Sequence, residues 1–277
     1  MVIDFITYSI RYILLHILPD RFSVRARHID PPQRVVISLS TIPNRINKLL
    51  PTLRSLTDQS MKSTQINLVV PRFSTREKKA YEIPEKIKQF PGLNIIGTEK
   101  DWGPITKLIP TLQSEAGQPD SIIIAVDDDN IYPPTFIETM VKGSLQHPHA
   151  ALGLCGCNLS PERRWDYGGG IKGNRIAEDR AVDFVLGCGG ILVKPAFFND
   201  ALLDYASAPK AAFFVDDIWI NGHLARNQIP RFVVAQASRV PVFLTTLTTL
   251  FSLSLDRNEN RLPDNNNQVI AHFESDW

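Results

Sequence analysis

The chain has 277 residues, of which 43% are hydrophobic and 21% charged, as in ordinary folded proteins and unlike disordered ones. Its 30 basic and 29 acidic residues give a net charge of +1, which offers no basic face for nucleic acid, so no nucleic-acid partner is expected. The length allows one large α/β domain or two small ones.

The N-terminal stretch is mostly apolar over residues 2–18, with Asp4 and Arg11 as interruptions. Asp4, Thr7 and Arg11 follow helical spacing, so residues 1–30 are predicted to contain an amphipathic helix, separate from the domain over 31–277. Such a helix can lie on an anionic membrane surface, or it can dock on the domain or on a partner chain. The stretch is short for a membrane span, and no small-residue cleavage site follows it. We expect a cytoplasmic protein, with peripheral contact to the cytoplasmic membrane face as one option.

The three cysteines, Cys155, Cys157 and Cys188, are too few and too unevenly spaced for a disulfide framework. The Cys-x-Cys pair has no second pair or nearby histidine to complete a zinc site. Free thiols in a reducing compartment are therefore expected.

From residue 31 onward, strand-like and helix-like segments alternate. In the first half, strands are predicted at 34–40, 65–70, 93–96 and 121–126, and helices at 45–56, 107–114 and 134–146. In the second half, strands are predicted at 150–154, 185–193 (bent, with the glycines at 187, 189 and 190) and 231–235, a helix at 216–226, and loops at 160–179 and 257–268. This alternation predicts a mainly parallel sheet with flanking helices. Residues 240–255 show no clean periodicity.

An acidic run ends one of these strands. The apolar residues 122–126 read as a buried parallel strand, and Asp127, Asp128 and Asp129 follow directly. Open α/β sheets bind ligands at that end of their strands. A divalent cation would relieve the repulsion between the acids, and oxygen ligands favour Mg²⁺ or Mn²⁺ shared with substrate phosphates. The alternative is a solvated acidic loop that caps the next helix.

Two further polar segments follow other predicted strands. In residues 40–45, Thr41 and Arg45 can hold a nucleobase or phosphate, although helix capping alone would explain the hydroxyls. In residues 101–107, which begin with Asp101, Lys107 is expected in the first turn of a helix. A cation is slightly unfavourable there unless it faces an anion, which suggests a phosphate.

A second pair of acids, Asp216 and Asp217, follows an aromatic and apolar run and opens a predicted helix. Capping explains Asp216, but it gives no role to Asp217 or to the neighbouring Trp219.

Over residues 34–236 the chain resembles the GT-A fold glycosyltransferases, in particular the family-2-like enzymes that use nucleotide-diphosphate sugars. The resemblance rests on the run 126–129, which matches the Asp-x-Asp signature, on the glycine-rich segment 187–190 and on the later acid pair. It implies a Rossmann-like GT-A sheet and a metal-dependent, inverting transfer of sugar to an acceptor hydroxyl on a glycan, lipid or small molecule. There is no Gln-x-x-Arg-Trp motif of the processive synthases, which favours addition of a single sugar.

The resemblance also implies roles for individual residues. Binding of the nucleotide-sugar would fall to Thr41, Arg45, Asp101, Lys107, Asp127 and Asp128. Asp129, with His272 completing the shell, would hold Mn²⁺ or Mg²⁺, and the acceptor and sugar would contact Gly189, Gly190 and Trp219. The general base would be Asp217, with Asp216 as the alternative.

Two other functions stay open on the sequence. A sugar-phosphate nucleotidyltransferase would carry a glycine-rich, basic loop after the first strand, but residues 40–45 contain no glycine. A non-catalytic, membrane-associated protein that binds a nucleotide-sugar would tolerate loss of Asp217. The sequence does not specify the base, the sugar or the acceptor.

Overall fold

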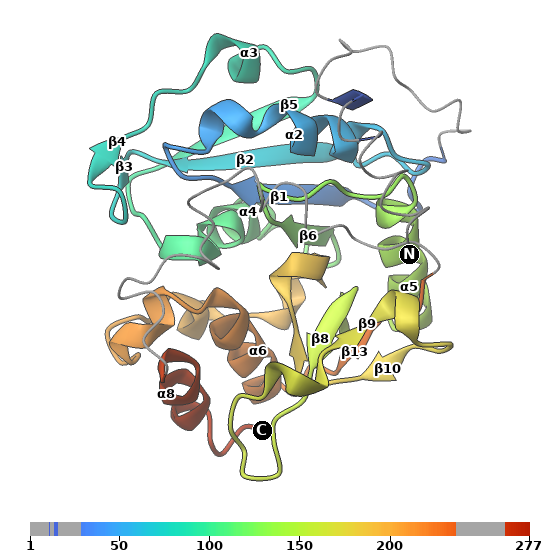
Figure 1. Cartoon of the computed structure of the whole chain (residues 1–277), viewed down its shortest axis with the longest axis vertical. Coiled ribbons are helices and arrows are strands. Elements are labelled where there is room, and N and C mark those ends of the chain that lie inside the picture. Colours follow the sequence, from blue (N-terminus) through green and yellow to red (C-terminus); the bar gives the residue numbers. More distant parts are fainter. Residues whose placement is uncertain (1–10, 12–13, 16–28, 237–263) are drawn as a thin grey trace.

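The structure is a computed structural model that describes residues 11, 14–15, 29–236 and 264–277. It has an α/β fold around one central sheet (Figure 1), as predicted. In spatial order the sheet consists of β10 (Arg180–Ala181), β13 (Arg231–Val233), β7 (Ala151–Gly153), β12 (Ile191–Val193), β6 (Ile122–Val126), β1 (Val35–Ser40), β2 (Gln65–Pro71) and β5 (Leu93–Thr98).

The four strands β5, β2, β1 and β6 pair in parallel, as the alternation of strands and helices predicts. Numbered along the chain, their order is 3-2-1-4, which is compatible with a Rossmann-like sheet. The chain moves outward from β1 to β2 and β5 and then returns to the other side of β1 with β6. The switch point of the sheet therefore lies between β1 and β6. Beyond β6 the sheet is mixed, because β12 runs antiparallel to both β6 and β7.

Helices cover both faces of the sheet, and the side chains of β6 alternate between them. Ile122 and Ile124 share a buried cluster with residues of α2 (Leu50–Thr57) and α5 (Phe136–Gln146). Ile123 shares a cluster with residues of α4 (Ile109–Ser114) and α6 (Asp216–Arg226) on the other face. Every residue of β6 is buried, which explains its unbroken apolar sequence.

Prolines divide two of the predicted helices. The segment predicted as a helix at 45–56 is a 3₁₀ turn, η1 (Ile46–Lys48), followed by α2, and Pro51 occupies the first turn of α2. Likewise, η2 (Gly103–Lys107) precedes α4, which has Pro110 in its first turn. The prediction that Lys107 lies in the first turn of a helix was therefore wrong, because it is the last residue of a 3₁₀ turn.

The bent strand predicted at 185–193 was also wrong. The chain leaves β11 (Phe184–Val185), makes a 3₁₀ turn, η5 (Gly187–Gly189), and only then enters β12 of the central sheet. The strand β11 belongs to a separate small sheet with β8 (Cys155–Cys157) and β9 (Ile171–Lys172). The predicted loop at 160–179 contains η3 (Tyr167–Gly169), β9 and η4 (Gly173–Arg175).

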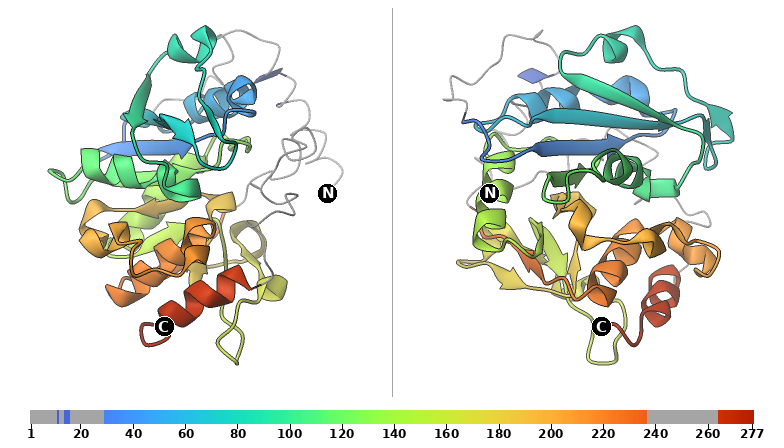
Figure 2. Two further views of the ribbon diagram at one scale, coloured as in Figure 1. Left: turned by 90° about the vertical axis from the view of Figure 1, so that its left-hand side faces the viewer. Right: turned by 180° about the vertical axis from the view of Figure 1, so that it is seen from behind.

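The remaining elements are short, apart from the last helix. They are the hairpin of β3 (Phe73–Ser74) and β4 (Lys79–Ala80), α3 (Glu85–Lys88), η6 (Pro195–Phe197), η7 (Asp200–Leu203), η8 (Lys210–Phe213) and α8 (Asn265–His272). Residues 265–268, predicted as part of a surface loop, form the first turn of α8. This helix lies beside α6 (Figure 1, Figure 2), where a Cβ on Gly222 of α6 would collide with the ring of Phe273.

Most of the predicted N-terminal helix and all of residues 240–255 lie outside the described residues. Arg11, which is described, forms an ion pair with Asp58 at 2.7 Å, and the guanidinium of Arg54 donates a hydrogen bond to the carbonyl oxygen of Leu15 at 2.7 Å. These contacts tie both residues to the end of α2. Within the described ranges, none of the helices has the length and hydropathy needed to cross a membrane.

Candidate active site

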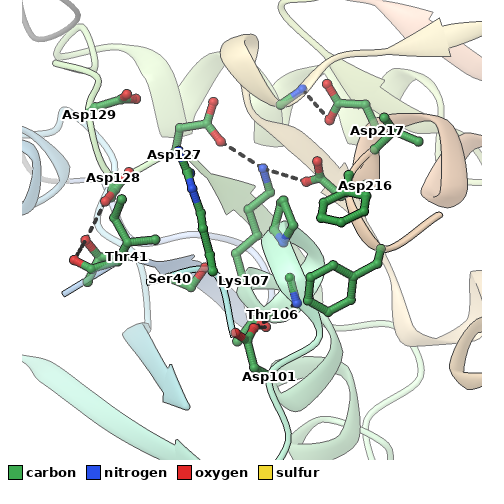
Figure 3. Close-up of a pocket in the computed structure, with 18 of the residues that line it drawn as sticks. Ser40, Thr41, Asp101, Thr106, Lys107, Asp127, Asp128, Asp129, Asp216 and Asp217 are labelled. Atoms are coloured by element: carbon green, nitrogen blue, oxygen red, sulfur yellow. Dashed lines mark hydrogen bonds and ion pairs between the residues drawn. The ribbon is translucent and has the colours of Figure 1, made fainter. Parts of the chain in front are cut away.

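A cavity of about 660 Å³ opens at the carboxyl ends of β1 and β6, where the sheet has its switch point. Polar residues that are far apart in the sequence meet in it (Figure 3). Nine of the predicted site residues line the cavity: Thr41, Arg45, Asp101, Lys107, Asp127, Asp128, Asp129, Asp216 and Asp217.

Asp128 is the buried anchor on one side of the cavity. Its carboxylate accepts a hydrogen bond of 2.5 Å from the Thr41 hydroxyl and forms an ion pair with Arg45, while its carbonyl oxygen accepts one of 2.9 Å from the Thr52 hydroxyl. Arg45 also pairs with Asp129, at 3.0 Å between Nη1 and Oδ2. Burial acts to lower the pKa of Arg45, but the charges of Asp128 and Asp129 outweigh it and leave that pKa raised. Asp128 thus positions Arg45 rather than offering a free carboxylate.

Asp129 carries charge that Arg45 compensates only in part. Burial, and then the negative charge of Asp128, raise the pKa of Asp129 to about 7, against the opposing effect of Arg45. Burial is the larger cause, and the part that comes from Asp128 is negative charge that a bound cation would offset.

Lys107 connects the two acidic groups of the cavity. Its Nζ lies 2.8 Å from Asp127 Oδ1 and 3.0 Å from Asp216 Oδ2 (Figure 3), and only 8% of its side chain is exposed. Burial would lower the pKa of Lys107, yet Asp127, Asp216 and Asp217 raise it well above its ordinary value. Lys107 is therefore a fixed positive charge between the end of β6 and the start of α6.

Tyr132 holds the backbone of Asp127 in place. Its buried hydroxyl accepts a hydrogen bond from the Asp127 N–H at 2.9 Å and donates one to the Asp127 carbonyl at 3.3 Å. The side chain of Asp127 is 31% exposed, compared with 2% for Asp128 and 18% for Asp129. Asp127 is thus the most accessible of the three acids. This role of Tyr132 was not predicted, because no local sequence pattern marks a tyrosine that hydrogen-bonds to the residue five positions earlier.

Gly187 and Asn221 position Asp217. The Gly187 N–H donates to Asp217 Oδ1 at 3.0 Å, and the Asn221 side chain donates to the Asp217 carbonyl at 2.7 Å. Burial, and then the charge of Asp216, raise the pKa of Asp217 to about 8. A Cβ on Gly187 would lie 2.8 Å from the Nζ of Lys107 and 3.0 Å from Asp217 Oδ1, so this close approach requires glycine. Of these two, Gly187 was predicted only as part of the glycine-rich segment, and Asn221 was missed.

Asp101 organises the loop after β5. Its two oxygens accept hydrogen bonds from the N–H groups of Thr75 at 2.7 Å and Gly103 at 2.8 Å. Gly103 has φ +70°, and a Cβ there would collide with the carbonyl oxygen of Phe213. Asp101 therefore shapes the cavity wall, and this loop packs closely against η8.

Four predicted site residues do not line the cavity, and their placement corrects the roles inferred for them. Trp219 is 1% exposed in the core, with its indole N–H donating to the Leu202 carbonyl at 3.1 Å. The ring centroid of His272 lies 5.6 Å from that of Trp219. His272 does not line the cavity, so it is not placed to hold a metal together with Asp129. A Cβ on Gly189 would meet the backbone nitrogen of Cys155, and one on Gly190 would meet the ring of Phe136. Of this glycine-rich segment, Gly187 and Cys188 face the cavity instead.

The donor chemistry of the cavity fits a divalent cation that shares its ligands with a phosphate group. Six aspartates line the cavity, against three basic residues, Arg45, Arg76 and Lys107. Among the described residues, however, no three His, Cys, Asp or Glu side chains converge closely enough to hold a metal ion. Magnesium is usually held by one or two carboxylates together with substrate phosphates, and Asp127 and Asp129 suit that arrangement.

Comparison of the sequence with protein-family models and with curated proteins finds no match. What the site can do is therefore argued from its geometry. It combines accessible carboxylates, two fixed cations and a half-buried carboxyl group, that of Asp217, whose pKa is raised to about 8, all within one cavity. This set can stabilise a leaving phosphate group and accept a proton from a nucleophile.

Proposed function

We propose that this chain is a metal-dependent glycosyltransferase of GT-A architecture that moves a sugar from a nucleotide-diphosphate sugar to an acceptor hydroxyl, with inversion. One observation carries the proposal. A single cavity at the switch point holds an acidic group suited to a metal and phosphates, and across Lys107 from it lies the half-buried carboxyl group of Asp217, with a pKa of about 8. The 3-2-1-4 order of the parallel strands supports it, because nucleotides bind at this position in open α/β sheets.

The donor diphosphate would lie between Asp127, Asp129 and Lys107. Asp127 and Asp129 would hold Mg²⁺ or Mn²⁺, which when bound supplies positive charge to the leaving diphosphate. Lys107 is charged and fixed by two ion pairs, so it needs little reorganisation to donate to a phosphate oxygen as negative charge develops there. Arg45, fixed by Asp128, adds a second cation on the same side.

The acceptor hydroxyl would be deprotonated by Asp217. The acceptor oxygen forms a bond to the anomeric carbon, the bond from that carbon to the diphosphate breaks, and the proton passes to Asp217. Oδ1 of Asp217 already accepts the Gly187 N–H, which leaves Oδ2 for this proton. A pKa of about 8 makes the ionised form of Asp217 a stronger base than an ordinary carboxylate, and the fraction of Asp217 in that form increases as the pH rises through 8.

The two alternatives lack a supporting observation. A nucleotidyltransferase would need a glycine-rich phosphate loop after β1, and the segment there is held by side-chain contacts of Thr41 and Arg45 instead. A protein that only binds a nucleotide-sugar gives no reason for an Asp217 held by both Gly187 and Asn221.

Calorimetric titration with UDP and GDP, in Mn²⁺ or Mg²⁺ and again in EDTA, tests the donor site. We expect one nucleotide to bind with metal, and EDTA or Asp129→Ala to abolish that binding. Asp120→Ala, which removes an exposed acid outside the cavity, is the matched control and should bind like the parent protein. Absence of binding by either nucleotide in all conditions would contradict the proposed donor site.

A further inference from the structure

Part of the cavity lining takes no part in the proposed donor site. We call the surface formed by Trp165, Asn265 and Asn266 the acceptor wall, and Phe214 and Val215, which precede the acid pair in sequence, also line the cavity. Among the described residues, this part of the lining has aromatic, aliphatic and amide side chains, and it contains no basic residue and no acid besides the Asp216 and Asp217 pair. A ligand bound there would be uncharged and would carry both apolar surface and hydrogen-bonding groups.

This wall is assembled from two segments about one hundred residues apart. The backbone N–H of Trp165 donates to the side chain of Asn267 in α8 at 2.9 Å. The preceding arginines add contacts to the same C-terminal segment, from Arg163 to the Trp277 carbonyl at 2.5 Å and from Arg164 to Asp264 at 3.5 Å. Loop and helix therefore present Trp165 and Asn266 as one surface.

The same wall is fixed relative to Asp217. The helix α6 begins with Asp216 and Asp217, and one and a half turns later Gly222 lies directly under the ring of Phe273. Further contact comes from Arg226, whose guanidinium pairs with Asp276 at 3.0 Å. Because α8 packs on the helix that carries the base, its amides stay at a constant position relative to the base.

We propose that this wall is the acceptor subsite and that the acceptor is a neutral saccharide. The inference rests on the proposed function, since it takes Asp217 as the base. The C–H face of a pyranose ring would pack on Trp165, and its hydroxyls would bond to the amide of Asn266. An indole face packs well against the apolar C–H face of such a ring, and an amide group can both donate hydrogen bonds to hydroxyls and accept them. Trp165 and Asn266 replace Trp219, Gly189 and Gly190 as the acceptor contacts.

Ligand-observed NMR with simple glycosides tests this subsite without requiring turnover. The probes are the methyl pyranosides of glucose, galactose, mannose and N-acetylglucosamine, each alone and with UDP or GDP and Mg²⁺. We expect saturation transfer to the ring protons of at least one glycoside. Trp165→Ala should weaken its binding by about tenfold and Trp165→Phe much less, because the phenyl ring keeps the aromatic face.

Variants on α8 provide the matched pair. Asn266→Ala should weaken glycoside binding about three- to tenfold through loss of hydrogen bonds, whereas Gln268→Ala, an exposed residue on the same helix outside the cavity, should leave it unchanged. Nucleotide affinity, measured by calorimetry, should be the same in all four variants. That readout separates a failure of the donor site from a failure of the acceptor subsite.

Three results would overturn the inference: no glycoside binds in any condition, Trp165→Ala binds like the parent, or a serine-containing peptide binds where glycosides do not. Octyl glycosides test whether the acceptor sugar is attached to a lipid. If octyl and methyl glycosides both bind and both depend on Trp165, tighter binding of the octyl forms indicates a sugar on a lipid. If only the octyl forms bind, and Trp165→Ala does not weaken them, the wall recognises an alkyl chain and the saccharide inference is wrong.

Discussion

The two ends of the cavity are built in different ways. At the donor end, charged residues follow β1, β5 and β6, so the parallel sheet brings these segments to one edge, and ion pairs of Arg45 and Lys107 then fix the side chains. At the acceptor end, Trp165 and α8 belong to short or irregular segments that are held by side-chain contacts between distant parts of the chain. The difference suggests that the chemistry of phosphate departure is fixed by the sheet, whereas acceptor choice can vary with the loops.

Asp217 and Lys107 lie where the two ends meet. Lys107 pairs with one acid from each group, Asp127 and Asp216, and Asp217 follows Asp216 in the first turn of α6. Variants at this junction should therefore have the largest effects, and variants that only support one end should have smaller ones.

Replacement of the base should have the largest effect. Asp217→Asn keeps the shape of the side chain but cannot accept the proton, so transfer should fall by about 10³-fold. Nucleotide affinity should hardly change, because the donor end is intact. Activity and calorimetry on the same preparation check both. Asp216→Asn is the matched variant, and a larger loss of transfer in Asp216→Asn than in Asp217→Asn would assign the base to Asp216.

A methyl group at Gly187 should have the next largest effect. In Gly187→Ala the new Cβ would lie 2.8 Å from Lys107 Nζ and 3.0 Å from Asp217 Oδ1, so these side-chain ends must shift by a few tenths of an ångström. Since displacement by about 1 Å can cost on the order of 10²-fold in rate, we expect a loss of about tenfold. Steady-state kinetics measure the loss.

Gly97→Ala is the control for this substitution. Gly97 lies in β5, and no other atom lies within 4 Å of the position that its Cβ would take. Its activity and melting temperature should match those of the parent. If Gly187→Ala also had parental activity, the close packing of Gly187 against Lys107 and Asp217 would not be needed for catalysis.

The sequence predicted the donor end better than the acceptor end, for reasons visible in single residues. The apolar run before Asp127 marks a buried strand, and parallel strands place their carboxyl ends at one edge, so Asp127 and Thr41 could be expected to meet. The partners of Lys107 could not be predicted, because the contact with Asp216 depends on how α6 packs. Trp219 was assigned to the site for its nearness to Asp217 in sequence, yet residues two apart on a helix point about 200° apart, and Trp219 faces the core.

A variant that removes only a supporting contact at the donor end should lose less activity. Tyr132→Phe removes the hydroxyl that accepts the Asp127 N–H and leaves this buried group without its partner. The free energy of unfolding should fall by about 1–3 kcal/mol, and activity only a few-fold, because the carboxylates themselves remain. Chemical denaturation and kinetics measure the two effects. Phe136→Leu, which changes a buried aromatic residue packed against Tyr132 at 4.5 Å between ring centroids, is the control for loss of packing without loss of the hydroxyl.

The smallest expected effect is a change in how the stability of the protein depends on pH, caused by the titration of Asp217. The pKa of Asp217 rises from an ordinary value of 3.8 to about 8 on folding, mainly through burial. Between these values the folded protein binds more protons than the unfolded chain, so the contribution of Asp217 to stability is present below pH 4 and is lost as the pH rises through 8. The amide in Asp217→Asn has no such titration. The variant should therefore gain at least about 2–4 °C in Tm relative to the parent between pH 5 and pH 9, because even roughly 1 kcal/mol of this loss gives such a shift in a protein of this size. Asp120→Asn, at an exposed position, should follow the parent at both values, and a Tm difference for Asp217→Asn that stays the same from pH 5 to pH 9 would show that Asp217 is not held protonated in the folded state.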